Sequence, residues 1–189
     1  MSSRTMSTEE HEQLHRAAEL LRPIARAARL GRKNGLGLLI FGVLGVLLSL
    51  PGLDAADFAI GAILTTTGLV EVRASRRLAR ADPAAPRLLA RNELLLMAGI
   101  LVYCMLQLTV LRASGDELAE LLGDTSALGI DVAALTDSVN AIIYSTFIAV
   151  TLLYQGGLVR YFLRRRPMID AYLRECPEWA RRVVVEVRD

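Results

Sequence analysis

The longest uncharged stretch of the chain, residues 138–159, holds 22 consecutive residues without Asp, Glu, Lys or Arg. As an α-helix with a rise of about 1.5 Å per residue, it would measure about 33 Å, enough to cross a hydrocarbon core of about 30 Å. The composition agrees with this reading, because 53% of the residues are apolar and only 5% are aromatic. Abundant Ala, Leu, Val and Gly suit helices that pack closely in lipid. The stretch therefore predicts a helix that spans a membrane.

Three further segments complete a predicted four-helix bundle. Residues 94–111 form 18 uncharged positions, and residues 35–53 form a glycine-rich apolar run that ends at Pro51-Gly52. The remaining segment is less apolar, because only residues 58–70 are free of charge. The four predicted spans cover about residues 35–53, 55–72, 94–111 and 138–159.

The segments outside the spans predict cytoplasmic helices. Residues 1–34 form an amphipathic helical leader, opened by the capping box Ser7-Thr8-Glu9-Glu10. We expect this helix to end near Arg22, before Pro23, and a second helical piece to continue through Leu30. Residues 73–92 form a basic connector of two helical extensions joined by a tight turn at Asp82-Pro83.

Two segments on opposite sides of the membrane complete the predicted organisation. Residues 112–137 form an outer loop with a second capping box at residues 114–117. Residues 164–189 form an amphipathic tail, in which Tyr172, Leu173 and Trp179 suit a membrane interface. The end of this tail, residues 183–187, fits a helix or a strand equally well.

The charges predict the orientation of the chain. Of 22 Lys and Arg residues, only Arg112 lies on the side of the outer loop. The other 21 lie in the leader, the connector and the tail. Since cytoplasmic loops carry the excess of basic residues, both termini are predicted to be cytoplasmic, in a bacterial plasma (inner) membrane.

One motif has the spacing of a zinc protease. His11-Glu12-Gln13-Leu14-His15 matches H-E-x-x-H, in which two imidazoles one helical turn apart share a metal ion. Its flanks are charged rather than apolar, no strand precedes it, and it lies before a span rather than inside one. We therefore predict neither a catalytic residue nor a metal or other cofactor, and keep His11 and His15 only as a candidate metal pair.

A polar seam is predicted on the third and fourth spans. Asn140, Tyr144, Thr151 and Gln155 fall on one face of the fourth span at about 100° per residue. They can meet Tyr103 and Gln107 of the third span, with Glu71 at the cytoplasmic mouth. The seam has two interpretations, interhelical hydrogen bonds worth about 0.6–2 kcal/mol each, or a wet path for an ion or small polar solute.

Two arginine clusters flank the spans on the predicted cytoplasmic side. They fit both a topological role and the binding of anionic lipid headgroups. Their members are Arg73, Arg76, Arg77 and Arg80 in the connector, and Arg164, Arg165 and Arg166 in the tail.

The first predicted hairpin resembles a known repeat. Residues 41–78 contain FGVLGVLLSLPGL, a proline turn, and GLVEVRASRRL. In these features they resemble the two-span repeat of the HdeD-like family of small bacterial membrane proteins. The resemblance covers about a fifth of the chain, and the second hairpin, with its long outer loop, departs from it. It implies a stress-associated membrane protein without a catalytic site.

The sequence thus predicts an all-α integral membrane protein with four transmembrane helices, an amphipathic N-terminal cytoplasmic helix and both termini cytoplasmic. The favoured function is non-enzymatic: a structural, interaction or stress-response role in a multi-pass protein. The predicted partners are membrane lipids, through their anionic headgroups on the cytoplasmic side, and further copies of the chain in a homo-oligomer; nucleic acid is not expected. The alternatives are a pore or small-solute transporter that uses the seam, and an H-E-x-x-H membrane metalloprotease.

Overall fold

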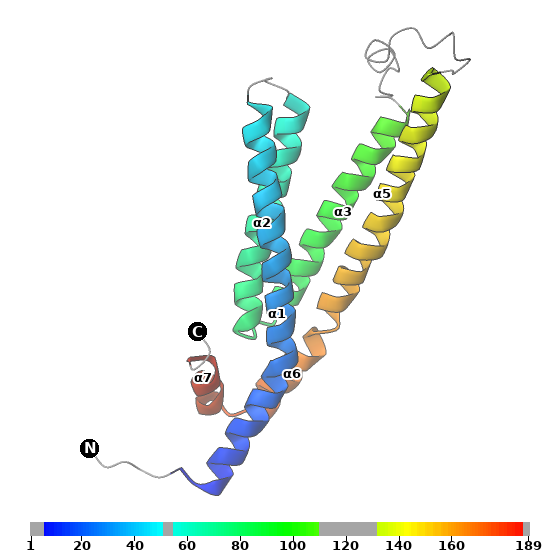
Figure 1. Cartoon of the computed structure of the whole chain (residues 1–189). Coiled ribbons are helices and arrows are strands. Elements are labelled where there is room, and N and C mark those ends of the chain that lie inside the picture. The colour runs from blue at the N-terminus through cyan, green and yellow to red at the C-terminus, as the bar shows by residue number, and fades with distance from the viewer. Residues whose placement is uncertain (1–5, 51–54, 110–131, 187–189) are drawn as a thin grey trace. The chain divides into compact units, whose positions relative to one another are not determined.

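The computed structural model describes residues 6–50, 55–109 and 132–186, and every regular element in these ranges is an α-helix (Figure 1). The prediction of an all-α chain is therefore confirmed. The helices are α1 (Thr8–Ser49), α2 (Ala55–Ala79), α3 (Ala85–Thr109), α5 (Val132–Leu163), α6 (Arg166–Glu175) and α7 (Glu178–Glu186).

The helices fall into two compact units. The α1–α2 unit comprises residues 1–92 and 159–189, and so contains α1, α2, the beginning of α3, the end of α5, α6 and α7. The α3–α5 unit comprises residues 93–158 and contains the rest of α3 and α5. Both termini of the chain thus belong to the α1–α2 unit.

Three of the described helical segments are long and apolar enough to cross a membrane. They are Thr8–Ser49, Ala85–Thr109 and Ala134–Glu175. They contain three of the four predicted spans, while α2, the predicted second span, is not among them. Its uncharged core, residues 58–70, is only 13 residues long and is bounded by Asp57 and Glu71. A count of four spans therefore stays a prediction.

The predicted capping box opens α1, but the predicted break at Pro23 is wrong. The Ser7 backbone N–H donates to Glu10 Oε2 at 2.8 Å, and the Glu10 N–H donates to Ser7 Oγ at 3.2 Å. The helix then runs without interruption through Pro23 to Ser49. Proline removes one helical hydrogen bond, but Leu21 and Ile24 on either side are fully buried, and their packing holds the helix together.

Glycines bring the backbones of α1 and α2 into close contact (Figure 1). A Cβ added to Gly61 would lie 2.6 Å from the Val46 nitrogen, and one added to Gly68 would lie 2.7 Å from the Gly35 carbonyl oxygen. Such distances leave no room for a methyl group, so the small residues set the spacing of the pair. The order of contacts, Gly31 with Ser75, Gly35 with Gly68 and Gly42 with Thr65, gives an antiparallel hairpin.

The predicted tight turn between α2 and α3 is confirmed. The Ala81 N–H donates to the Leu78 carbonyl at 2.9 Å, and the Asp82 N–H donates to the Arg77 carbonyl at 3.1 Å. These two bonds form a Schellman motif, in which the residue after the helix takes the left-handed conformation. Here that residue is Ala81, with φ of 56°.

Asp82 fastens this turn and gives it a pH dependence. Its Oδ1 accepts from the Ala84 N–H and its Oδ2 from Arg77 Nε, both at 2.8 Å. The Ala84 bond, together with Arg77, holds the pKa of Asp82 below its ordinary value despite the opposing effect of burial. Because the pKa is lower in the folded state, the stabilisation exists above the unfolded-state pKa of about 3.9 and is lost as pH falls toward the folded value.

Asp82→Asn is therefore expected to reduce the loss of stability between about pH 5 and pH 3 by about 1 kcal/mol. The measurement is the detergent-unfolding midpoint of each protein across this pH range. Asp170→Asn is the control, since the Asp170 carboxylate makes no hydrogen bond within the described residues. If the unfolding midpoints of wild type and Asp82→Asn changed with pH in parallel, Asp82 would not be the source of this pH dependence.

The C-terminal tail consists of two helices that pack against α1. Pro167 lies in the first turn of α6, where a missing N–H costs nothing. The described part of the ambiguous segment, residues 183–186, is helical. Tyr172, expected at a membrane interface, is instead 1% exposed, and burial raises the pKa of its phenol. Arg16 of α1 also pairs with Glu175 of α6 at 3.0 Å.

Two predictions concern residues for which no structure is described. Most of the predicted outer loop, including the capping box at residues 114–117, lies outside the described residues. So does Pro51-Gly52, the predicted end of the first span, although α1 ends at Ser49, close to that position.

Candidate functional site

The polar seam is a set of side chains on α3 and α5 within the α3–α5 unit. Gln107 Nε2 donates to Tyr103 Oη at 3.1 Å on α3. The Tyr103 ring meets the Tyr144 ring of α5 edge to face, with centroids 6.3 Å apart and planes at 73°. Three of the predicted seam residues are therefore in contact, and they join the two helices.

A small cavity lies further along the seam. It has a volume of about 70 Å³ and is lined by Gln107, Leu108, Asp137, Asn140 and Ala141. This volume has room for one or two water molecules. The cavity brings Asn140 and Gln107 together as predicted, and it adds Asp137, which the sequence reasoning had placed in the outer loop.

Thr151 and Gln155 occupy buried positions of α5. Their exposed fractions are 7% and 5%, whereas the neighbouring Tyr154 is 52% exposed. Gln155 Oε1 has no hydrogen-bond partner among the described residues. The half-buried Tyr144 and the buried Thr151 and Gln155 thus lie on one face of α5, as expected from the sequence, because residues four and seven apart share a helix face.

Glu71, predicted at the mouth of the seam, belongs to the α1–α2 unit. There it is fully buried and accepts two hydrogen bonds from Asn34 Nδ2, at 2.9 Å to Oε1 and 3.0 Å to Oε2. Asn34 was missed by the sequence reasoning. Asn92 of α3 donates to the Thr67 carbonyl of α2 at 3.2 Å.

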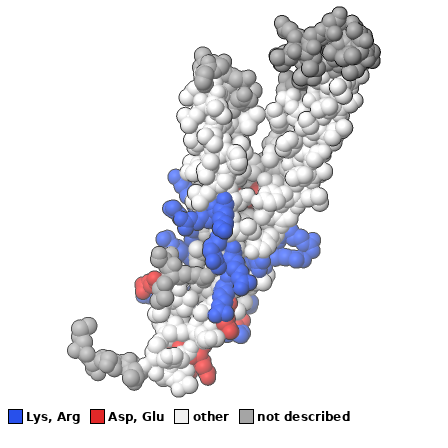
Figure 2. All heavy atoms as spheres, viewed as in Figure 1, with Lys and Arg blue, Asp and Glu red and all other residues white. Residues whose placement is uncertain are grey.

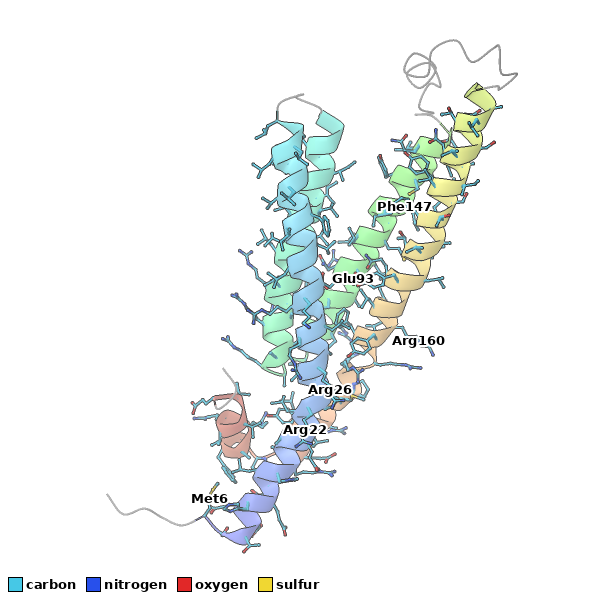
Figure 3. The ribbon with its side chains drawn as sticks, in the orientation of Figure 1. Met6, Arg22, Arg26, Glu93, Phe147 and Arg160 are labelled. Atoms are coloured by element: carbon cyan, nitrogen blue, oxygen red, sulfur yellow. The ribbon has the colours of Figure 1, made fainter. Side chains whose placement is uncertain are left out.

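The arginine clusters lie on the α1–α2 unit. Figure 2 shows Lys and Arg atoms gathered over one stretch of this unit, and the rest of the α1–α2 hairpin face in view carries none. Arg22 and Arg26 project from α1 in the same region (Figure 3). The predicted residues Arg73, Arg76, Arg77, Arg80, Arg164, Arg165 and Arg166 all belong to this unit.

These arginines have different surroundings. Arg77 is paired with Asp82, as described above, and Arg165 lies over the Tyr161 ring at 4.3 Å from its centroid. Arg76 and Arg80 line a cavity beside α1 and α2. Like them, Arg73, Arg164 and Arg166 are exposed. The clusters are thus not uniform, because only Arg76 and Arg80 among them line this cavity.

The H-E-x-x-H motif lies on the exposed first turns of α1. His11 Nδ1 is 3.4 Å from the Ser7 carbonyl oxygen, and His15 Nδ1 is 3.6 Å from Glu19 Oε1. The His15 side chain is 74% exposed. Across the described residues, no group of three or more His, Cys, Asp and Glu side chains is placed to hold a metal ion.

Comparison with known proteins gives no family to which these residues can be related. No family model, no curated protein and no solved structure matches the chain.

Proposed function

We propose that this chain is a non-enzymatic, multi-pass integral membrane protein with a structural or interaction role. The observation that carries the proposal is the exposure of large apolar side chains along α1, α3 and α5. Phe41 of α1, Leu95 of α3 and Phe147 of α5, for example, are 70%, 64% and 57% exposed. Figure 3 shows the position of Phe147 on α5. Contiguous apolar surface of this kind is unfavourable in water and favourable in lipid.

The packing of α2 on α1 supports four spans. The apolar part of α1 contacts α2 directly, with Gly42 against Thr65 and Gly45 against Gly61. If residues 35–49 of α1 cross the hydrocarbon core, α2 must cross at the same depth. As an α-helix, α2 satisfies its own backbone hydrogen bonds there. Its less apolar sequence is tolerated because Glu71 is buried and hydrogen-bonded to Asn34.

The proposed orientation rests on the arginines. In the described residues they lie away from the end of the α1–α2 hairpin at which α1 ends and α2 begins. By the positive-inside rule, both termini would lie on the cytoplasmic side of the membrane, which we propose to be a bacterial inner membrane. There the exposed Arg73, Arg164 and Arg166 can contact anionic headgroups.

The resemblance of residues 41–78 to the HdeD-like repeat favours a stress-related role within this class. We also propose a homo-oligomer, since α5 exposes large apolar side chains, such as Ile142, Phe147 and Leu153, that could pack against a second copy. The stress-related role and the homo-oligomer are both narrower versions of the proposed structural or interaction role.

For the seam, we propose packing as its function. Tyr103, Gln107 and Tyr144 contact one another, and such contacts stabilise helix pairs in lipid. The alternative, a pore or small-solute transporter, is favoured by one observation, the polar cavity of about 70 Å³ beside Asn140 and Asp137.

The test is reconstitution of the purified chain in liposomes with wild type and the double variant Asn140→Leu/Gln155→Leu. We expect no ion conductance or solute uptake from wild type, and an assembly state by native mass spectrometry that the seam substitutions leave intact. Conductance in wild type that disappears in the double variant would replace this proposal with the pore. Stoichiometric zinc with peptidase activity lost in Glu12→Gln would replace it with the metalloprotease.

A further inference from the structure

We infer that the α1–α2 unit contains a specific binding site for a phosphate group, in a cavity of about 530 Å³ lined by four arginines. This volume lies within the range of small-ligand sites. Arg29 and Arg32 come from α1, Arg76 comes from α2, and Arg80 directly follows α2. The inference rests on the proposed membrane location only where the phosphate belongs to a lipid.

The hairpin packing explains why these side chains meet. Gly31 lies directly against Ser75, so close that a Cβ on Gly31 would overlap Ser75 Oγ. Arg29 and Arg32 flank Gly31 on α1, while Arg76 follows Ser75 on α2 and Arg80 lies just beyond the end of α2. The absence of a side chain at residue 31 therefore brings basic residues of both helices to the same level.

The charge of the cavity is uncompensated within the described residues. No carboxylate there lies within 4 Å of any of these four guanidinium groups, whereas Arg16, Arg77 and Arg182 each have an acidic partner. None of the residues that line the cavity is acidic. Four like charges around one space repel one another, and an anion in that space would remove the repulsion.

The donors suit a phosphate group in particular. Guanidinium groups present paired N–H donors that match phosphate oxygens in a bidentate manner. Ser75 also lines the cavity; it is 1% exposed, and its Oγ has no hydrogen-bond partner in the described part of the chain. Arginine side chains that reach a tetrahedral anion from two sides of the cavity can surround it.

The C-terminal helix α7 forms one side of the site. Val185 of α7 lines the cavity. An adjoining hollow of about 330 Å³ contains Arg80 again, with Arg182 and Glu178 of α7. Arg182 pairs with Glu178 at 2.5 Å, and Glu186 of α7 also lines this hollow.

The test measures phosphate binding by the full chain in detergent. One arm uses native mass spectrometry with phosphatidylglycerol and, as a comparison lipid without a phosphate group, diacylglycerol. The other arm uses calorimetry with inorganic phosphate and glycerol phosphate. We expect Arg29→Gln/Arg76→Gln to bind at least tenfold more weakly than wild type, since each removed charged hydrogen-bond donor costs about tenfold. Arg87→Gln/Arg91→Gln, which removes the same charge from exposed positions outside the cavity, should bind like wild type.

A steric variant tests the site without changing its charge. Ala79→Phe fills the cavity from its wall and should weaken binding as much as the arginine variant. Preference for phosphatidylglycerol with no effect of free phosphate assigns the site to a lipid headgroup, and the reverse assigns it to a soluble phosphate compound. Equal loss in both arginine pairs, or wild-type binding by Ala79→Phe, would overturn the inference. If the protein inserts into liposomes but does not bind phosphate at this site, this inference is wrong and the proposed function still stands.

Discussion

Gly42→Ala is expected to destabilise the α1–α2 hairpin by about 3 kcal/mol, a large effect for one methyl group. A Cβ at this position would overlap the backbone nitrogen of Thr65 and would lie 2.9 Å from the Gly61 carbonyl oxygen. Both neighbours are backbone atoms of a helix, so they cannot move aside as a flexible side chain can. The helices must separate, and the contacts on either side of Gly42 are lost with them.

The measurement is an SDS titration of the purified protein in mild detergent. Unfolding is followed by circular dichroism and by the fluorescence of Trp179, the only tryptophan of the chain, which lies on α7 of the same unit. Gly37→Ala is the control, because a Cβ there would meet nothing within 4 Å. Alanine favours a helix over glycine by about 1 kcal/mol, so this variant should be at least as stable as wild type. Similar midpoints for Gly42→Ala and Gly37→Ala would contradict close packing at Gly42.

The features that the sequence predicted well are those set by neighbouring residues. The capping box at Ser7 and Glu10 acts over three residues, and it opens α1 as expected. The turn at Asp82 follows from local proline and Asx chemistry in the same way. The prediction of a helix break at Pro23 was wrong, although the rule behind it is also local. The burial of Leu21 and Ile24 outweighs the hydrogen bond that proline removes.

The candidate sites needed information that no single helix contains. The α3–α5 seam was predictable from the sequence. In each helix the spacing of the polar residues shows which face is polar, and only a few polar side chains are available to pair between the two faces. The pairing of Asn34 with Glu71, and of Arg29 with Arg76 around one cavity, depends instead on the register between α1 and α2. Gly31 and Gly35 form a G-x-x-x-G pair just before the predicted first span, and this was the signal that could have placed Asn34 in a helix contact.

Asn34→Asp is expected to destabilise the protein by about 3–5 kcal/mol, the range found when a buried charge loses its partner. The substitution replaces the amide that donates to both carboxylate oxygens of Glu71 with a second carboxylate. Glu71 is fully buried, so water screens the repulsion between the two groups only slightly. Asn34→Leu removes the donor without adding charge, so it should lower the free energy of unfolding by less, about 1–3 kcal/mol.

The reversed pair separates this interaction from general damage to α1. Asn34→Asp combined with Glu71→Gln exchanges the two chemical groups, so the amide now donates from α2 to a carboxylate on α1. We expect the double variant to recover most of the stability lost in Asn34→Asp, because one carboxylate and one amide again face each other. SDS titration of wild type, Asn34→Asp, Glu71→Gln and the double variant yields the coupling energy, which should be at least 1 kcal/mol for residues in direct contact. Additive losses would mean that Asn34 and Glu71 do not interact, and α2 would then need another way to carry its buried carboxylate into the membrane.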